Sequence, residues 1–116
     1  MRPTALVLVF GLLWPCSSFS QTPEQRMNYA FKTGNELLEN CSAPPSSGPY
    51  VACFSYISGV ADTLSMMNIA CTSPLGGNER QMTDLVANRL RAHPEIRHYA
   101  AAGEVLLALK DSFPCR

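Results

Sequence analysis

Cysteines and histidines are the residues of this chain best suited to chemistry. The two histidines, His93 and His98, are five residues apart across Pro94, so they cannot share one face of a helix. No two cysteines form the Cys-x-x-Cys pair that is typical of a metal site, since they stand far apart, as Cys16, Cys41, Cys53, Cys71 and Cys115. The spacing therefore predicts no metal site.

Other catalytic arrangements are equally weak. A cysteine nucleophile needs a free thiol beside a histidine, and an even set of cysteines in an exported chain is better explained by disulfides. Glu95 and Glu104 could form a pair of carboxylates, but nine scattered acidic residues produce such pairs by chance. Gly76-Gly77 lacks the lysine that follows in a phosphate-binding loop. We therefore expect a protein that is not an enzyme and has no cofactor.

Residues 1–20 have the composition of a signal peptide. Arg2 gives a positive start, residues 5–14 form an apolar run, and residues 18–20 offer small side chains for cleavage before Gln21. The apolar run is too short to cross a bilayer, which takes about 20 residues. We therefore predict export by a cleaved signal peptide.

The alternative is a lipoprotein that is acylated at Cys16. The bulky Trp14 and the rigid Pro15 stand where an acylation site needs small residues, so cleavage before Gln21 is the preferred interpretation.

Residues 21–116 are long enough for a single small domain. Without Arg2 this part carries eight Lys and Arg residues against nine Asp and Glu. It has no basic stripe for nucleic acid and no basic amphipathic helix for a membrane surface. The balance of charge favours a domain that binds another protein.

Apolar spacing predicts an all-α domain of four helices. The first helix spans residues 22–41 and has Phe31 on its apolar face. The second begins near Tyr50 and carries its apolar stripe to Met67. The third begins at a cap formed by Asn78 and Gln81 and ends before Pro94, and the fourth covers residues 101–112 with Ala102, Val105, Leu106 and Leu109 facing inward.

The order of the helices selects one disulfide pairing. Cys16 leaves with the signal peptide, and the four remaining cysteines allow three pairings. Short connections favour a small up-down bundle, which brings Cys41 to Cys53 at one pole and Cys71 to Cys115 at the other. The other pairings would have to span a helix about 27 Å long, whereas a disulfide needs Cα atoms within about 7 Å. We therefore predict Cys41–Cys53 and Cys71–Cys115.

Three features of the second helix allow more than one interpretation. Gly59 costs about 1 kcal/mol relative to alanine in a helix interior, so we expect it to permit close packing of another helix. Asp62 is either solvated or forms a structural polar bond with Arg97 or His98. Met66-Met67 belongs either to the core or to an adaptable contact surface.

The segment between the second and third helices is a candidate partner-binding loop. It places Leu75 among proline and glycine residues, and two charged residues follow. Such loops are usually connectors, but they also insert into the clefts of partner proteins. The candidate residues are Pro74, Leu75, Gly76, Gly77, Asn78, Glu79 and Arg80.

Three short motifs stand in a fixed order along the predicted domain. Tyr-Ile-Ser-Gly-Val-Ala-Asp ends at Asp62, His-Pro-Glu begins at His93, and Phe-Pro-Cys ends at Cys115. This combination, which extends from about Gly34 to the end of the chain, resembles the Rap/Tai immunity proteins.

The resemblance implies a periplasmic homodimer that binds a peptidoglycan amidase delivered by type VI secretion and plugs its active-site cleft. It assigns Gly59, Asp62, His98 and the cysteines to the scaffold. The chain departs from the family pattern at residues 71–77, where we expect partner specificity. The alternative is a general periplasmic protein-binding or acid-chaperone module without a toxin partner.

Overall fold

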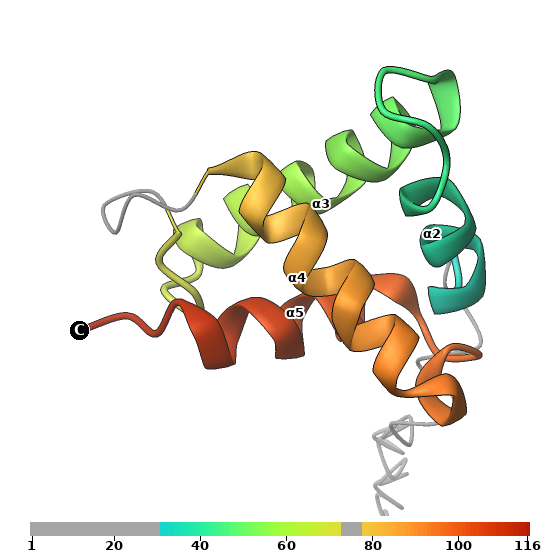
Figure 1. Cartoon of the computed structure of the whole chain (residues 1–116). Coiled ribbons are helices and arrows are strands. Elements are labelled where there is room, and N and C mark those ends of the chain that lie inside the picture. The colour runs from blue at the N-terminus through green and yellow to red at the C-terminus, as the bar shows by residue number, and fades with distance from the viewer. Residues whose placement is uncertain (1–30, 73–77) are drawn as a thin grey trace, which may run out of the picture.

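The computed structural model describes residues 31–72 and 78–116, which fold into four α-helices and one 3₁₀ turn (Figure 1). These are α2 (Gly34–Cys41), α3 (Gly48–Met66), α4 (Glu79–Ala92), η1 (Pro94–Ile96) and α5 (Ala101–Ser112). The all-α prediction is confirmed. The predicted signal peptide, residues 21–30 and residues 73–77 lie outside the described residues.

The four helices pack around a shared core. α3, α4 and α5 run in alternating directions, and the short α2 lies against the first part of α3 (Figure 1). α2 also contacts α4 and α5, so each helix touches all three others. This arrangement brings the end of α3 to the end of α5.

The start of α2 differs from the prediction of a helix over residues 22–41. Thr33 has an extended backbone and caps α2 through a capping box, in which its hydroxyl accepts a bond from the Glu36 backbone N–H. Hydrogen bonding by the Thr33 backbone, and next by its side chain, lowers the pKa of Glu36. Phe31 is fully exposed rather than part of an apolar helix face. The predicted helix is therefore wrong at residues 31–33, and its part over residues 22–30 lies outside the described residues.

The reason for this late start is a pairing between distant segments. The backbone N–H of Gly34 donates to the Tyr99 carbonyl at 2.9 Å, and that of Ala101 donates to the Lys32 carbonyl at 2.9 Å. Thr33 and Ala100 form an isolated antiparallel bridge. Because the chain before α2 binds the chain before α5, it cannot also continue as a helix.

The predicted bounds of α4 and α5 are confirmed. Asn78 caps α4, with its Oδ1 atom accepting a bond from the Gln81 backbone N–H at 2.8 Å. α4 ends at Ala92, just before His93 and Pro94, as the proline rule predicts. α5 covers the predicted residues, although no side chain caps its first turn.

The core contains most of the predicted apolar stripe, with four corrections besides Phe31. Met66 and Met67 are 89% and 63% exposed, so the interpretation of this pair as core is wrong. In the first turn of α5 Ala101 is buried, whereas the predicted Ala102 is exposed. Gly59 is also exposed, and a Cβ atom built there would meet no other atom within 4 Å, so it does not serve close helix packing.

Close packing around a glycine occurs at Gly34 instead. A Cβ atom at this position would lie 3.0 Å from the Arg97 carbonyl oxygen and 3.0 Å from the Leu90 side chain. The lack of a side chain therefore allows the start of α2 to rest on the turn after α4.

Both predicted disulfides are confirmed. Cys41–Cys53 and Cys71–Cys115 join Cα atoms 5.1 and 4.9 Å apart and close loops of 12 and 44 residues. On the loop-entropy model these bonds contribute about 3 and 4 kcal/mol to stability. The backbone N–H of Cys71 also donates to the Phe113 carbonyl at 2.8 Å, so the last residues are tied to the end of α3 by two bonds.

Candidate functional site

The predicted partner-binding loop lies only partly within the described residues. Pro74, Leu75, Gly76 and Gly77 fall outside them, whereas Asn78, Glu79 and Arg80 form the exposed start of α4. Arg80 also borders a hollow of about 240 Å³ together with Tyr50 and Phe54 of α3. The start of α4 therefore presents charge beside two aromatic side chains.

The residues on either side of the loop are well anchored. Thr72 is buried, and its hydroxyl lies 3.4 Å from that of Ser65, which in turn donates to the Ala70 carbonyl. Cys71 is held by its disulfide. On the other side, the capping box of Asn78 fixes the first turn of α4. The two anchors fix where the chain leaves α3 and where it enters α4.

The three predicted structural polar residues do not form one cluster. Asp62 is exposed on α3, and among the described residues it makes no hydrogen bond to Arg97 or His98. The Arg97 guanidinium instead donates to the carbonyls of Leu90 at 2.6 Å and Arg91 at 2.9 Å, at the end of α4. The His98 ring is exposed and packs against the ring of Tyr99, with centroids 4.0 Å apart.

The two glutamates in the last third of the domain, Glu95 and Glu104, have separate partners. Glu95 is exposed and lies 3.0 Å from His93 Nδ1; its own backbone N–H, and next the His93 side chain, lower the pKa of Glu95. Glu104 is only 4% exposed, and its Oε2 atom lies 3.3 Å from Nε of Arg89. They do not form a pair of catalytic carboxylates.

The ion pair of Arg89 with Glu104 was not predicted, although the sequence contains a signal for it. Glu104 follows the buried Ala101 by three residues and precedes the buried Ala108 by four, so helical spacing places it on the inner face of α5. An acidic residue on such a face requires a partner, and Arg89 of α4 provides it.

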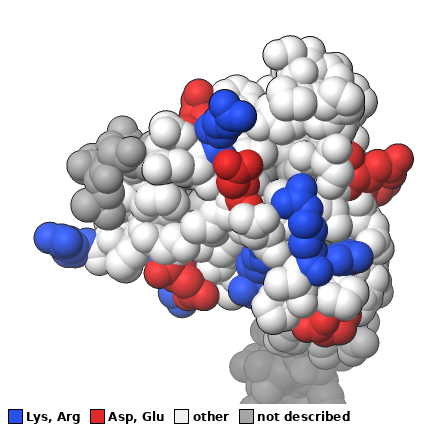
Figure 2. Space-filling view, viewed as in Figure 1, with Lys and Arg blue, Asp and Glu red and all other residues white. Residues whose placement is uncertain are grey.

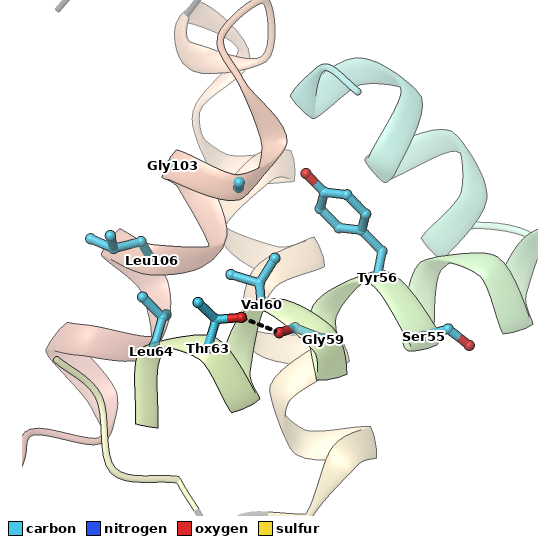
Figure 3. Close-up of a pocket in the computed structure, with 9 residues that line it drawn as sticks. Ser55, Tyr56, Gly59, Val60, Thr63, Leu64, Gly103 and Leu106 are labelled. Carbon is cyan, nitrogen blue, oxygen red and sulfur yellow. Dashed lines mark hydrogen bonds between the residues drawn. The ribbon is translucent and has the colours of Figure 1, made fainter. Parts of the chain in front are cut away.

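An apolar groove of about 550 Å³ lies between α3 and α5 (Figure 3). Gly59 and Thr63 of α3 form one side, Gly103 and Leu106 of α5 form the other, and Tyr56 closes one end. Burial raises the pKa of Tyr56, and the backbone of Ala102 partly opposes this effect. This groove was not predicted, because Leu106 and Ala102 were assigned to the core.

A second apolar hollow of about 420 Å³ lies on the other side of α5. Gly103 and Leu106 line it as well, together with Ile96 and Tyr99 of the segment after α4. Leu107, which is 41% exposed, stands at its edge. The exposed face of α5 thus lies between two apolar hollows.

Charged side chains are spread over the face shown in Figure 2. Both signs occur along α4, and no patch of one sign dominates this view. α3 has a different character: Asp62 is its only charged residue. The face near α3 is therefore the less charged part of the described molecule.

The described residues contain neither a free thiol nor a cluster of metal ligands. All four of their cysteines are in disulfides, and they contain no group of three potential metal ligands. No helix among residues 31–72 and 78–116 is long and apolar enough to cross a membrane. Their two notable surface features are the anchored residues on either side of residues 73–77 and the apolar groove between α3 and α5.

Comparison with known proteins bears on the kind of partner. No curated protein matches the chain significantly. The family model described as Rap1a immunity proteins matches residues 33–115, which is well over half of the chain. The chain therefore belongs to the Rap1a immunity proteins, a family that is not enzymatic.

Proposed function

We propose that this protein binds a peptidoglycan amidase toxin in the periplasm and protects the producing cell by blocking the toxin's cleft. The observation that carries the proposal is the family match over residues 33–115. The two disulfides support an oxidising compartment, since such bonds persist in the periplasm and are rare in the cytosol. The predicted signal peptide at residues 1–20 would provide export.

Two properties support inhibition by steric blocking of the toxin's cleft. The family is not enzymatic, so we expect inhibition to come from occupying the cleft. A plug must not deform when it enters the cleft, and two disulfides in a small domain limit such deformation. We further propose that the protein acts as a homodimer, as the resemblance implies.

The loop from Pro74 to Arg80 is the proposed inserting element. The Cys71–Cys115 disulfide holds the chain before it, and the Asn78 capping box fixes its last residues at the start of α4. Fixed ends lower the entropy that a loop loses on binding, which favours affinity. Leu75 is the aliphatic side chain of this loop, and Glu79 and Arg80 offer charge at its base.

The direct test uses the oxidised protein, as processed by the cell, and the product of the adjacent gene. Binding is measured by calorimetry, and peptidoglycan cleavage is followed in the same mixtures. We expect tight binding and loss of cleavage at one equivalent of binding sites. Tight binding without loss of cleavage would contradict blocking, and the absence of binding to this product would favour the general protein-binding module.

The role of the loop is tested by Leu75→Asp. On the proposal that residue 75 enters the toxin's cleft, a carboxylate there should weaken toxin binding at least about 100-fold, because the charge would be desolvated without a partner. Val51→Asp is the matched control, since Val51 is a half-exposed aliphatic residue near the start of α3 and is not one of the proposed inserting residues. Normal inhibition by Leu75→Asp, or equal losses for both variants, would place the contact elsewhere.

A further inference from the structure

We propose that Met66 and Met67, at the end of α3, form a second contact surface for the toxin, against an apolar rim of the cleft that the loop enters. The sequence allowed this methionine pair to belong to the core or to a contact surface. The two side chains are 89% and 63% exposed, which excludes the core. The inference rests on the proposed function and deepens it, since it names a further surface that the same partner covers.

The methionine pair stands beside the point where the chain leaves α3 for the loop. The Thr72 hydroxyl lies 3.4 Å from the Ser65 hydroxyl, and Ser65 immediately precedes Met66. The backbone N–H of Ile69 donates to the Leu64 carbonyl at 2.9 Å, so the chain folds back onto the last turn of α3. A cleft that receives the loop therefore has one rim close to the methionine pair.

The turn after α3 leaves these two side chains uncovered. Asn68 has a left-handed backbone, with φ of 56°, a conformation that asparagine adopts more readily than most residues. After this reversal Ile69 is half-buried and Ala70 is buried against the core. The fold thus turns the apolar residues after Asn68 inward and leaves Met66 and Met67 in solvent.

The chemistry of this surface suits an apolar partner. Residues 63–72 contain no charged side chain, and depletion of charge distinguishes the buried centre of protein interfaces from the rest of the surface. Methionine side chains are unbranched and polarizable, so they adapt to the shape of a partner. Among the described residues, the other large apolar side chains that are exposed stand singly in the sequence, as Phe31, Val51 and Leu107.

The position of the methionine pair selects the toxin as its occupant. A body that receives the loop covers the residues beside the loop's first anchor, Thr72, and the methionine pair is among them. Any other occupant of this surface would stand in the way of the loop's entry into the cleft. The loop and the methionine pair are therefore covered by the same partner.

Charged variants test the contact with the product of the adjacent gene. Met66→Glu and Met67→Glu should each raise its dissociation constant at least about 10-fold, because each brings an unpaired charge into a desolvated contact. Met66→Leu keeps the apolar side chain and should bind like the wild type. Phe31→Glu is the matched control: it places the same charge at a fully exposed position next to the segment that pairs with the start of α5, whereas the methionine pair lies toward the end of that helix.

Oxidation of the methionines gives a second test that needs no substitution. Hydrogen peroxide transfers one oxygen atom to the thioether sulfur, which becomes a sulfoxide, and the peroxide is reduced to water. Met66 and Met67 should be oxidised at least about 10-fold more slowly in the complex than in the free protein, because oxidation follows exposure. Met82 is only 5% exposed and should be oxidised slowly in both. Mass spectrometry of peptides from this chain gives each rate.

The outcomes separate this inference from the proposed function. Unchanged affinity in both glutamate variants, or equal oxidation rates in the free protein and the complex, would overturn the inference while toxin binding stands. Oxidation of the methionine pair as slow as that of Met82 in the free protein would also overturn it, because another copy of the chain would then already cover this surface. If the product of the adjacent gene does not bind at all, the proposed function fails and the inference fails with it.

Discussion

At the scale of single residues, the most consequential interaction is the ion pair between Arg89 and Glu104. It joins α4 to α5, and the carboxylate is almost completely removed from solvent. A buried charge without its partner is strongly destabilising, whereas an exposed pair contributes little. The Arg89 side chain is 29% exposed. We therefore expect the loss of stability on removing it to lie between that of a fully buried ion pair and that of an exposed one.

Arg89→Met should therefore lower the free energy of unfolding by about 2 kcal/mol, because it leaves the Glu104 carboxylate buried and unpaired. The measurement is urea unfolding of the oxidised protein. Arg91→Met is the control: Arg91 lies two residues away on α4, is exposed and binds only Asn88 through its side chain. Equal stability of the two variants would mean that the ion pair does not hold the two helices together.

Some residue roles could be predicted from the sequence and others could not. The disulfide partners followed from helix order alone. The bonds of Arg97 did not, because its guanidinium reaches backbone carbonyls at the end of α4, and such acceptors have no signature in the sequence. Gly59 and Gly34 were both visible as glycines in helical patterns, but only the tertiary contacts show that Gly34 is the closely packed one.

At the scale of the elements, helix ends with local signals were predictable. The Asn78 cap and the stop before Pro94 depend on residues within a few positions, and both are confirmed. The start of α2 depends on the pairing of Thr33 with Ala100, which is distant in sequence. Apolar periodicity continued through this point, so the pattern alone favoured a longer helix. The sequence did contain a signal for the start of α2, because Thr33 and Glu36 have the spacing of a capping box.

The contact between α2 and the turn after α4 gives a prediction at this scale. Gly34→Ala should lower the free energy of unfolding by about 2 kcal/mol, because the new methyl group would press on the Arg97 carbonyl and the Leu90 side chain. Gly48→Ala is the matched control, since a Cβ atom there meets nothing within 4 Å, and its effect should stay within about 0.5 kcal/mol. The measurement is thermal or urea unfolding of both variants. If Gly34→Ala were as stable as Gly48→Ala, the close contact at Gly34 would be contradicted.

At the scale of the whole molecule, the Cys71–Cys115 disulfide closes the fold. It links the end of α3 to the end of the chain and encloses α4 and α5 in its loop. The same bond fixes the base of the proposed inserting loop. Stability and recognition are therefore expected to depend on the same covalent link.

Replacing both Cys71 and Cys115 with serine should lower the melting temperature by about 10 °C or more, since a loop of this length contributes about 4 kcal/mol. The double replacement avoids a free thiol that would form disulfides between molecules. Replacing Cys41 and Cys53 in the same way should have a smaller effect, because that loop is shorter. The reverse order of the two melting temperatures would contradict the loop-entropy account.

The central claim is protection against a toxin in the periplasm, and survival of cells tests it most directly. The product of the adjacent gene is directed to the periplasm of a test strain, with this chain expressed either complete or without residues 1–20. We expect lysis without the chain, normal growth with residues 1–116, and lysis again when residues 1–20 are removed. Lysis that continues in the presence of the complete, exported chain would contradict the account.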